Sequence, residues 1–279
     1  MIKTQTIKIA HSPDSDDAFM FYAIKQQKIN LRAYSFEISS DEIDVLNQTA
    51  INSNTEAPYD VFAVSFHAYH YLKERYAMLR SGASMAGQDY GPRLVSKNPI
   101  DPQGQLKIAV PGKFTSAFLA LQIWLEEKHI NKSQVEFIFC SYNDVFPLLE
   151  AATVDASLLI HESQLKFQEQ GYHLIVDLGQ WWYTNYTSNL RMPLGCNVIR
   201  RSLGDKVIAD VDTLLQESIE WGLKNFDEVL AYSRNFAQNG LDDAQAERYI
   251  HMYVDESTIK LTDNDLRSVE LLLSKVSSF

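Results

Sequence analysis

Hydrophobic and polar positions follow two different patterns over the first 200 residues of the chain, one typical of strands and one typical of helices. Short runs of β-branched and aromatic residues are typical of strands, and longer stretches with apolar residues three or four positions apart are typical of helices. The predicted strands are Thr6–Ala10, Arg32–Ile38, Val61–Val64, Ala77–Ser81, Arg93–Ser96, Lys107–Val110, Val135–Phe139, Ala156–Ile160, His173–Asp177 and Cys196–Ile199. The predicted helices are Asp16–Gln27, Glu42–Asn52, His67–Lys73, Ser116–Lys128, Val145–Ala152 and Ser163–Gln170. Strands and helices that alternate in this way indicate an α/β fold with mostly parallel sheets.

Two segments rich in turn residues interrupt the alternation, at residues 97–104 and 191–195. The chain between them has the pattern of a compact βαβ-type unit. We therefore predict two lobes with a central cleft, joined by two crossings of the chain. Lobe 1 is expected to contain residues 1–97 and 198–279, and lobe 2 is expected to contain residues 98–197.

A purely helical pattern begins after Arg201. Four amphipathic periods and no convincing strand follow, and we expect these helices to cover the sheet of lobe 1. The periods are Val211–Lys224, Phe226–Asn235, Asp243–Met252 and Asp263–Ser277.

The composition excludes several classes of protein. With 46% hydrophobic residues the chain has the make-up of a packed globular protein. Its 25 basic and 36 acidic side chains give a net charge of −11, which disfavours nucleic acid as a partner. No stretch reaches the ~18 consecutive apolar residues of a membrane helix, so we expect no membrane partner. The first residues lack the apolar core of a signal peptide, so we expect a cytoplasmic location. Cys140 and Cys196 are too few for a disulfide framework and are expected to be buried thiols. No pattern specifies an oligomeric state.

The loops that follow the predicted strands carry the candidate chemistry, because α/β sheets bind ligands beyond the carboxyl ends of their strands. Four such loops contain hydroxyl, carboxyl or imidazole groups: residues 11–17, 65–67, 111–117 and 161–163. In the third loop, Gly112 permits a tight turn, and Thr115 or Ser116 can cap the following helix. The free N–H groups of that helix start and the two hydroxyls suit a carboxylate or phosphate. A capped helix without a ligand is the alternative.

His161 is the most interesting ionisable group in these loops. It directly follows a largely apolar predicted strand, residues 154–160, and therefore lies at the carboxyl end of that strand. An imidazole titrates near neutrality, which suits a proton acceptor in a cleft. Glu162 could orient the ring or cap the next helix. The alternative is a hydrogen-bonded structural histidine.

Other patterns have simpler explanations than a functional site. Asp14, Asp16 and Asp17 lack the spacing of a calcium loop and fit an acidic helix start, so no metal is expected there. His67 and His70 have only loose zinc spacing, without a cysteine nearby. No nucleophile elbow, dinucleotide-binding glycine pattern or Cys-x-x-Cys motif is present.

Several motifs together resemble one family. In order, they are Ser12-Pro-Asp-Ser-Asp-Asp-Ala-Phe19, Gly82-Ala-Ser84 with Tyr90-Gly-Pro92, Pro111-Gly112 with Thr115-Ser-Ala117, Ile160-His-Glu162, Trp181-Trp182 and Pro193-Leu-Gly195. Over residues 7–200 the chain is thus similar to 1,4-dihydroxy-6-naphthoate synthase of the futalosine route to menaquinone. The resemblance implies a two-lobe, type 2 periplasmic-binding-protein-like fold with C-terminal helices. It also implies conversion of cyclic dehypoxanthine futalosine, a small-molecule carboxylate, into dihydroxynaphthoate without a metal or organic cofactor.

The resemblance further implies the site residues. His161 matches the family's proposed base, Thr115 and Ser116 match a substrate-contacting pair, and the strand end Ala63, Val64 and Ser65 matches a second contacting segment. Ser12 and Asp14 belong to the first loop at the cleft. Typical members have Ser-Pro-Cys-Pro-Asn-Asp-Thr-Phe in that loop and a lysine at the position of Ala63, so this chain has a more acidic cleft. A non-catalytic solute-binding protein and the related chorismate dehydratase are the alternative functions.

Overall fold

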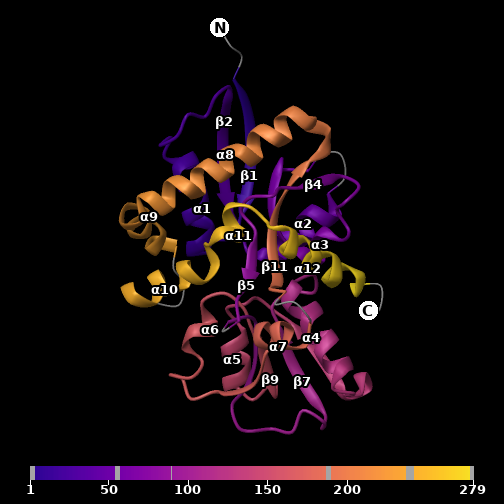
Figure 1. Cartoon of the computed structure of the whole chain (residues 1–279). Helices are drawn as coiled ribbons and strands as arrows, with labels where there is room; N and C mark the ends of the chain where they lie inside the picture. The colour runs from indigo at the N-terminus through magenta and orange to yellow at the C-terminus, as the bar shows by residue number, and fades with distance from the viewer. Residues whose placement is uncertain (1–3, 54–56, 89, 187–189, 237–241, 277–279) are drawn as a thin grey trace.

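The computed structural model describes residues 4–53, 57–88, 90–186, 190–236 and 242–276. Two β-sheets form the centre of the molecule, and the chain crosses between them twice. The larger sheet and the C-terminal helices occupy the upper half of Figure 1, and the smaller sheet with its helices occupies the lower half. In the described parts of the chain, no helix is both long and apolar enough to cross a membrane.

The larger sheet has the strand order β2-β1-β3-β11-β4, with the short β5 also paired to β11. Its strands are β1 Gln5–His11, β2 Tyr34–Ser40, β3 Val61–Ser65, β4 Tyr76–Met78, β5 Ser84–Ala86 and β11 Met192–Arg200. Its connecting helices are α1 Ser15–Lys25, α2 Ile43–Asn52 and α3 Phe66–Tyr69. Strand β1 runs parallel to β2 and β3, so the loops that follow β1 and β3 open on the same edge.

The smaller sheet has the order β10-β6-β9-β7-β8. Its strands are β6 Arg93–Ser96, β7 Leu106–Val110, β8 Val135–Phe139, β9 Ala156–Leu159 and β10 His173–Asp177. Its helices are α4 Ser116–Glu127, α5 Val145–Glu150, α6 Ser163–Lys166 and α7 Leu178–Asn185. Because β7 and β9 are parallel neighbours, the loops that follow them also share an edge.

Helices α8 to α12 pack on the larger sheet and on α1 (Figure 1), as the helical periods predict. They are α8 Asp205–Lys224, α9 Phe226–Ser233, α10 Asp243–Tyr253, α11 Glu256–Ile259 and α12 Asp263–Ser274. The buried positions of α8 recur every three or four residues, and they join strand residues such as Ile9 and Ile199 in one apolar cluster. A side chain at Gly222 would place its Cβ 2.9 Å from the Phe19 ring, so this glycine allows α8 to approach α1 closely. The last predicted helix ran to Ser277, which lies outside the described residues.

The structure differs from the sequence prediction in sheet type. Of the nine strand pairings in the described residues, four are parallel, so the expectation of mostly parallel sheets is wrong. The antiparallel pairings arise where the chain crosses between the sheets: β6 enters the smaller sheet against β9, and β11 returns to the larger sheet against β3. Strand β5 and helices α7 and α11 were not predicted, because they are too short to show a period.

The strand pairing also differs from the expected lobe boundaries. Strand β6, expected in lobe 1, pairs in the smaller sheet, and residues 192–197 of β11, expected in lobe 2, pair in the larger sheet. Each boundary falls one strand or less from the position predicted from turn residues. The division of the chain into two lobes with a central cleft stays a prediction.

Candidate active site

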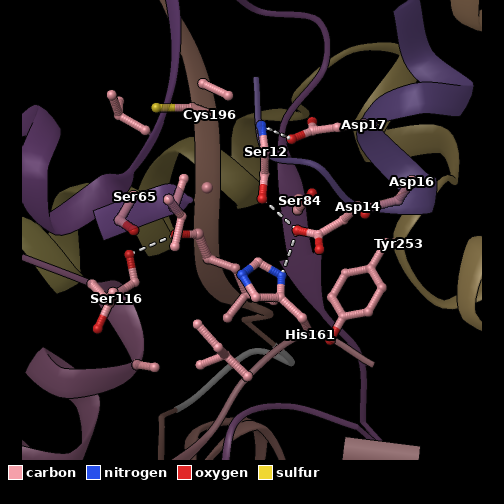
Figure 2. A pocket seen from close by; sticks show the side chains of 18 of the residues that line it. Ser12, Asp14, Asp16, Asp17, Ser65, Ser84, Ser116, His161, Cys196 and Tyr253 are labelled. Carbon is pink, nitrogen blue, oxygen red and sulfur yellow. Dashed lines mark hydrogen bonds and ion pairs between the residues drawn. The ribbon is translucent and has the colours of Figure 1, made fainter. Parts of the chain in front are cut away.

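One cavity between the two sheets brings together all eight residues that the sequence predicts for the site. They come from four places: the loop after β1, the end of β3, the start of α4 and the loop after β9. They are Ser12, Asp14, Ala63, Val64, Ser65, Thr115, Ser116 and His161. Figure 2 shows His161 and Asp14 at one side of this cavity and Ser65 and Ser116 at the other.

His161 is held by a carboxylate from the opposite sheet. Its Nδ1 lies 2.8 Å from Oδ2 of Asp14, and the same oxygen accepts a hydrogen bond from the Ser12 hydroxyl at 2.5 Å (Figure 2). Nε2 of His161 lines the cavity and has no hydrogen-bond partner within the described residues. The backbone of His161 is left-handed, with φ of 55°, a conformation uncommon outside glycine and asparagine. The ring therefore has one anchored nitrogen and one nitrogen without a hydrogen-bond partner among the described residues.

The charges around His161 change its protonation. Burial alone would lower its pKa, but the charge and hydrogen bond of Asp14, helped by Asp16 and Glu162, raise the pKa to about 9. For the Asp14 carboxyl the effects are reversed: burial would raise its pKa, but the charge and hydrogen bond of His161 hold this pKa below its ordinary value. The two groups therefore form an ion pair at neutral pH. This corrects the expectation of an imidazole that titrates near neutrality.

The other two aspartates of the first loop carry less charge than their number suggests. Burial and the neighbouring Asp14 raise the pKa of Asp16 to about 7, and burial with both neighbours raises the pKa of Asp17 well above its ordinary value. Asp17 also accepts the N–H of Ser12 at 2.8 Å. Helix α1 begins at Ser15 with both aspartates in its first turn, which confirms the helix-start interpretation. Across the described ranges, no group of three or more His, Cys, Asp or Glu side chains is placed to hold a metal ion.

The start of α4 offers backbone N–H groups, whereas its two hydroxyls are already used. Thr115 is the N-cap: its Oγ1 accepts the N–H of Phe118 at 3.2 Å and donates to the carbonyl of Gly112 at 3.0 Å. Ser116 Oγ donates to the carbonyl of Leu194 at 2.6 Å and accepts the N–H of His67 at 3.3 Å. Both hydroxyl protons thus have protein acceptors in this structure, and binding of a carboxylate by these two hydroxyls stays a prediction. The N–H groups of Ser116 and Ala117, which precede the capped N–H of Phe118 and have no intrahelical acceptor, remain as donors.

Ser65 supplies a hydroxyl that is only half used. Its Oγ accepts from the Asn47 amide at 3.1 Å, and its N–H donates to the same side chain at 2.9 Å. In the described structure its hydroxyl proton has no acceptor, so it can be donated to a ligand. Ala63 and Val64 precede it on the buried β3 and contribute cavity wall without a polar side chain.

Further cavity residues come from segments that sequence reasoning did not assign to the site. Ser84 lies on the unpredicted β5, Gln164 follows in α6, and Tyr253 comes from α10. The Gln164 amide lies 3.1 Å from the Tyr253 hydroxyl, so the C-terminal helices close one side of the cavity. The motif Gly82-Ala-Ser84 was the only available signal for Ser84. No sequence motif assigned Tyr253 to the site, because its helix was expected only to cover the sheet of lobe 1.

The two facing sheets, the two crossings and the ligand cavity between the strand ends define a periplasmic-binding-protein-like fold. A ligand-binding component of an ABC-type import system from Staphylococcus aureus shares this fold, with a TM-score of 0.70 over 99% of this chain and 93% of that chain at 12% identity. A crystal structure of a protein from Archaeoglobus fulgidus is more similar. It has a TM-score of 0.88 and 34% identity, and the match covers 98% of this chain and 97% of that chain.

The chain belongs to the menaquinone biosynthesis family, whose sequence model matches residues 7–278. A relative from Thermus thermophilus, named 1,4-dihydroxy-6-naphthoate synthase, is 28% identical over 98% of this chain and 95% of its own length. A relative of the same name from Streptomyces coelicolor is 26% identical over 99% of this chain and 95% of its own length. The resemblance seen in the motifs is confirmed, and it extends through the C-terminal helices.

Proposed function

We propose that this chain is a lyase that converts cyclic dehypoxanthine futalosine into 1,4-dihydroxy-6-naphthoate, with His161 as general base. The observation that supports this most directly is the buried Nε2 of His161, which faces a cavity with hydrogen-bond donors on its far side. Two relatives named for this reaction match nearly the whole chain. The substrate combines a carboxylate with an ionisable carbon, and the two sides of the cavity suit these two groups.

The donor side would orient the substrate. A carboxylate at the start of α4 would accept the backbone N–H groups next to Thr115 and gain from the helix dipole. The Ser65 hydroxyl would add a third donor. With its carboxylate held there, the substrate would extend across the cavity and place its reacting carbon near His161.

The base side would start the reaction. Neutral His161 would take a carbon-bound proton through Nε2, and the electron pair left behind would open the ring and expel the sugar-derived remainder. Aromatisation of the product would make the overall step favourable. Because proton abstraction and elimination deliver no electrons to an outside acceptor, the proposed step needs no redox cofactor. With a pKa of about 9, roughly 1% of His161 is neutral at pH 7 in the free protein, so turnover should increase as the pH rises toward 9.

The test is to incubate the purified protein with cyclic dehypoxanthine futalosine and to follow dihydroxynaphthoate by mass spectrometry. The variant His161→Asn removes Nε2, and asparagine tolerates the left-handed backbone at this position. We expect kcat to fall by a factor on the order of 10²–10⁴, the range typical of a general base. The control is His173→Gln, an exposed histidine on β10, which should retain full activity.

Two outcomes would contradict the proposal. Equal turnover by wild type and His161→Asn would exclude His161 as the base. Thermal stabilisation by the substrate without any product would instead indicate a binding protein, a function that the import component of the same fold already has.

A further inference from the structure

Asp14 and His161 meet across the boundary between the two sheets. Asp14 follows β1 of the larger sheet, and His161 follows β9 of the smaller one, yet Oδ2 and Nδ1 lie 2.8 Å apart. The next residue of each loop makes a parallel link, since the Ser15 hydroxyl donates to Oε1 of Glu162 at 3.0 Å. Two consecutive contacts thus fix the loop after β1 against the loop after β9.

The carboxylate of Asp14 is itself firmly held. Asp14 is 2% exposed, and the Ser12 hydroxyl donates to the same oxygen that contacts the imidazole. Asp14 is also the N-cap residue of α1, where the helix dipole favours a negative charge. Apart from the imidazole, its carboxylate is held by a hydroxyl of its own loop, while its other oxygen, Oδ1, has no hydrogen-bond partner among the described residues.

The contact determines which nitrogen of His161 can react. A carboxylate next to Nδ1 keeps a proton on that nitrogen, so the neutral imidazole has its lone pair on Nε2. Nε2 is the nitrogen that lines the cavity without a partner among the described residues. The other groups facing the ring are Asp16, Glu162 and the edge-on ring of Tyr142, whose centroid is 5.4 Å away. Among the residues that the structure describes, the ion-pair partner of Nδ1 is the Asp14 carboxylate.

We propose that Asp14 is the positioning residue of His161: it fixes the tautomer and direction of the ring and stabilises the imidazolium that forms when Nε2 accepts a proton. This proposal rests on the proposed function, because it assumes that His161 acts as the base. It also assigns a role to the first loop, which carries this carboxylate. Because the two residues belong to different sheets, the reactive arrangement exists only while the two loops are in contact.

The test is Asp14→Asn, which keeps the shape of the side chain and removes its charge. We expect kcat to fall by a factor on the order of 10²–10⁴ with KM changed less than about threefold, since the donors at α4 are untouched. The pKa in the pH profile of kcat/KM should fall from about 9 toward 6.5. The matched control is Asp60→Asn, a buried aspartate paired with Arg200 in the same sheet and away from the cavity. It should lower stability but leave kcat and the pH profile as in wild type.

Nitrogen NMR of His161 separates this proposal from the proposed function, because it needs no substrate. In wild type the neutral ring should carry its proton on Nδ1, with a pKa near 9; in Asp14→Asn the tautomers should mix and the pKa should fall. If the tautomer and pKa are the same in both proteins, Asp14 does not position the ring. If they change as expected but wild type shows no turnover, the proposed reaction is wrong and the positioning of His161 stands. Full kcat in Asp14→Asn, in a wild type that is active, would also overturn the proposal.

Discussion

The ion pair between His161 and Asp14 predicts a loss of stability in mildly alkaline solution. A histidine whose pKa is raised in the folded protein contributes stability that is fully present below its unfolded pKa and is lost as the pH rises through the folded value. For His161 the two values are 6.5 and about 9. At 1.36 kcal/mol per pKa unit, this difference corresponds to a contribution of about 3 kcal/mol at low pH. About 2 kcal/mol of it should be lost between pH 7.5 and pH 9.5.

Urea denaturation of wild type and His161→Asn at these two pH values measures the effect. Other groups near the cavity also titrate: the pKa of Asp16 is about 7 and that of Asp17 is raised, whereas burial raises the pKa of Tyr142 far above this interval. The wild type should lose about 2 kcal/mol more of its free energy of unfolding than the variant over the interval. The variant removes the titrating imidazole and serves as the baseline for groups outside the first loop, whose carboxyl pKa values themselves depend on the His161 charge.

A parallel loss in both proteins would refute this reasoning. It would mean that His161 has the same pKa in the folded and unfolded chain, and therefore that Asp14 does not hold it as an imidazolium. A wild type that gains stability relative to His161→Asn as the pH rises would contradict even the direction of the pKa shift.

Two further predictions concern the donor side of the cavity. Ser65→Ala should raise KM about tenfold and lower kcat less, because the variant lacks one hydrogen-bond donor to the substrate carboxylate, a loss of about 1.5 kcal/mol in binding. Steady-state kinetics would test this, and an unchanged KM would place the carboxylate elsewhere. Gly112→Ala should destabilise the protein by about 1–3 kcal/mol in chemical denaturation, because its φ is 102° and a Cβ would lie 2.4 Å from Oδ1 of Asp44. Gly171→Ala is the matched control, since its φ is also positive but nothing lies near its Cβ, and equal losses in both variants would exclude the contact with Asp44 as a cause.

The location of the site could be predicted from the sequence because it depends on a general property of strands. Parallel strands end at the same edge, so Ser12 and Ser65 could be assigned to one side of a cleft from the ends of β1 and β3. His161 could be assigned to the facing side, because it follows β9 in the other sheet. The tight turn at Gly112 and the cap at Thr115 are local patterns, and both were found as expected.

The chemistry within the site could not be predicted in the same way, because it depends on contacts between distant segments. The two hydroxyls at the start of α4 looked available from the sequence, but Thr115 bonds within its own turn and Ser116 bonds to the carbonyl of Leu194 on β11. An ordinary pKa was expected for His161, because no sequence spacing shows that Asp14 lies against its ring. For Ser116 and His161 the element was predicted correctly, and the partner that sets the chemistry comes from far along the chain.

The order of strands in the larger sheet has a consequence for how the chain is made. Strand β11 lies between β3 and β4 and also pairs with β5, yet it follows the whole smaller sheet in the sequence. During synthesis, one edge of β3 and the short strands β4 and β5 must wait without this partner until residues 192–200 leave the ribosome. The strands of the smaller sheet are contiguous in sequence, from Arg93 to Asp177, so they can pair before that point. The nascent chain can therefore complete its second sheet before its first, and until then the edge of β3 that later pairs with β11 is open to association with other chains.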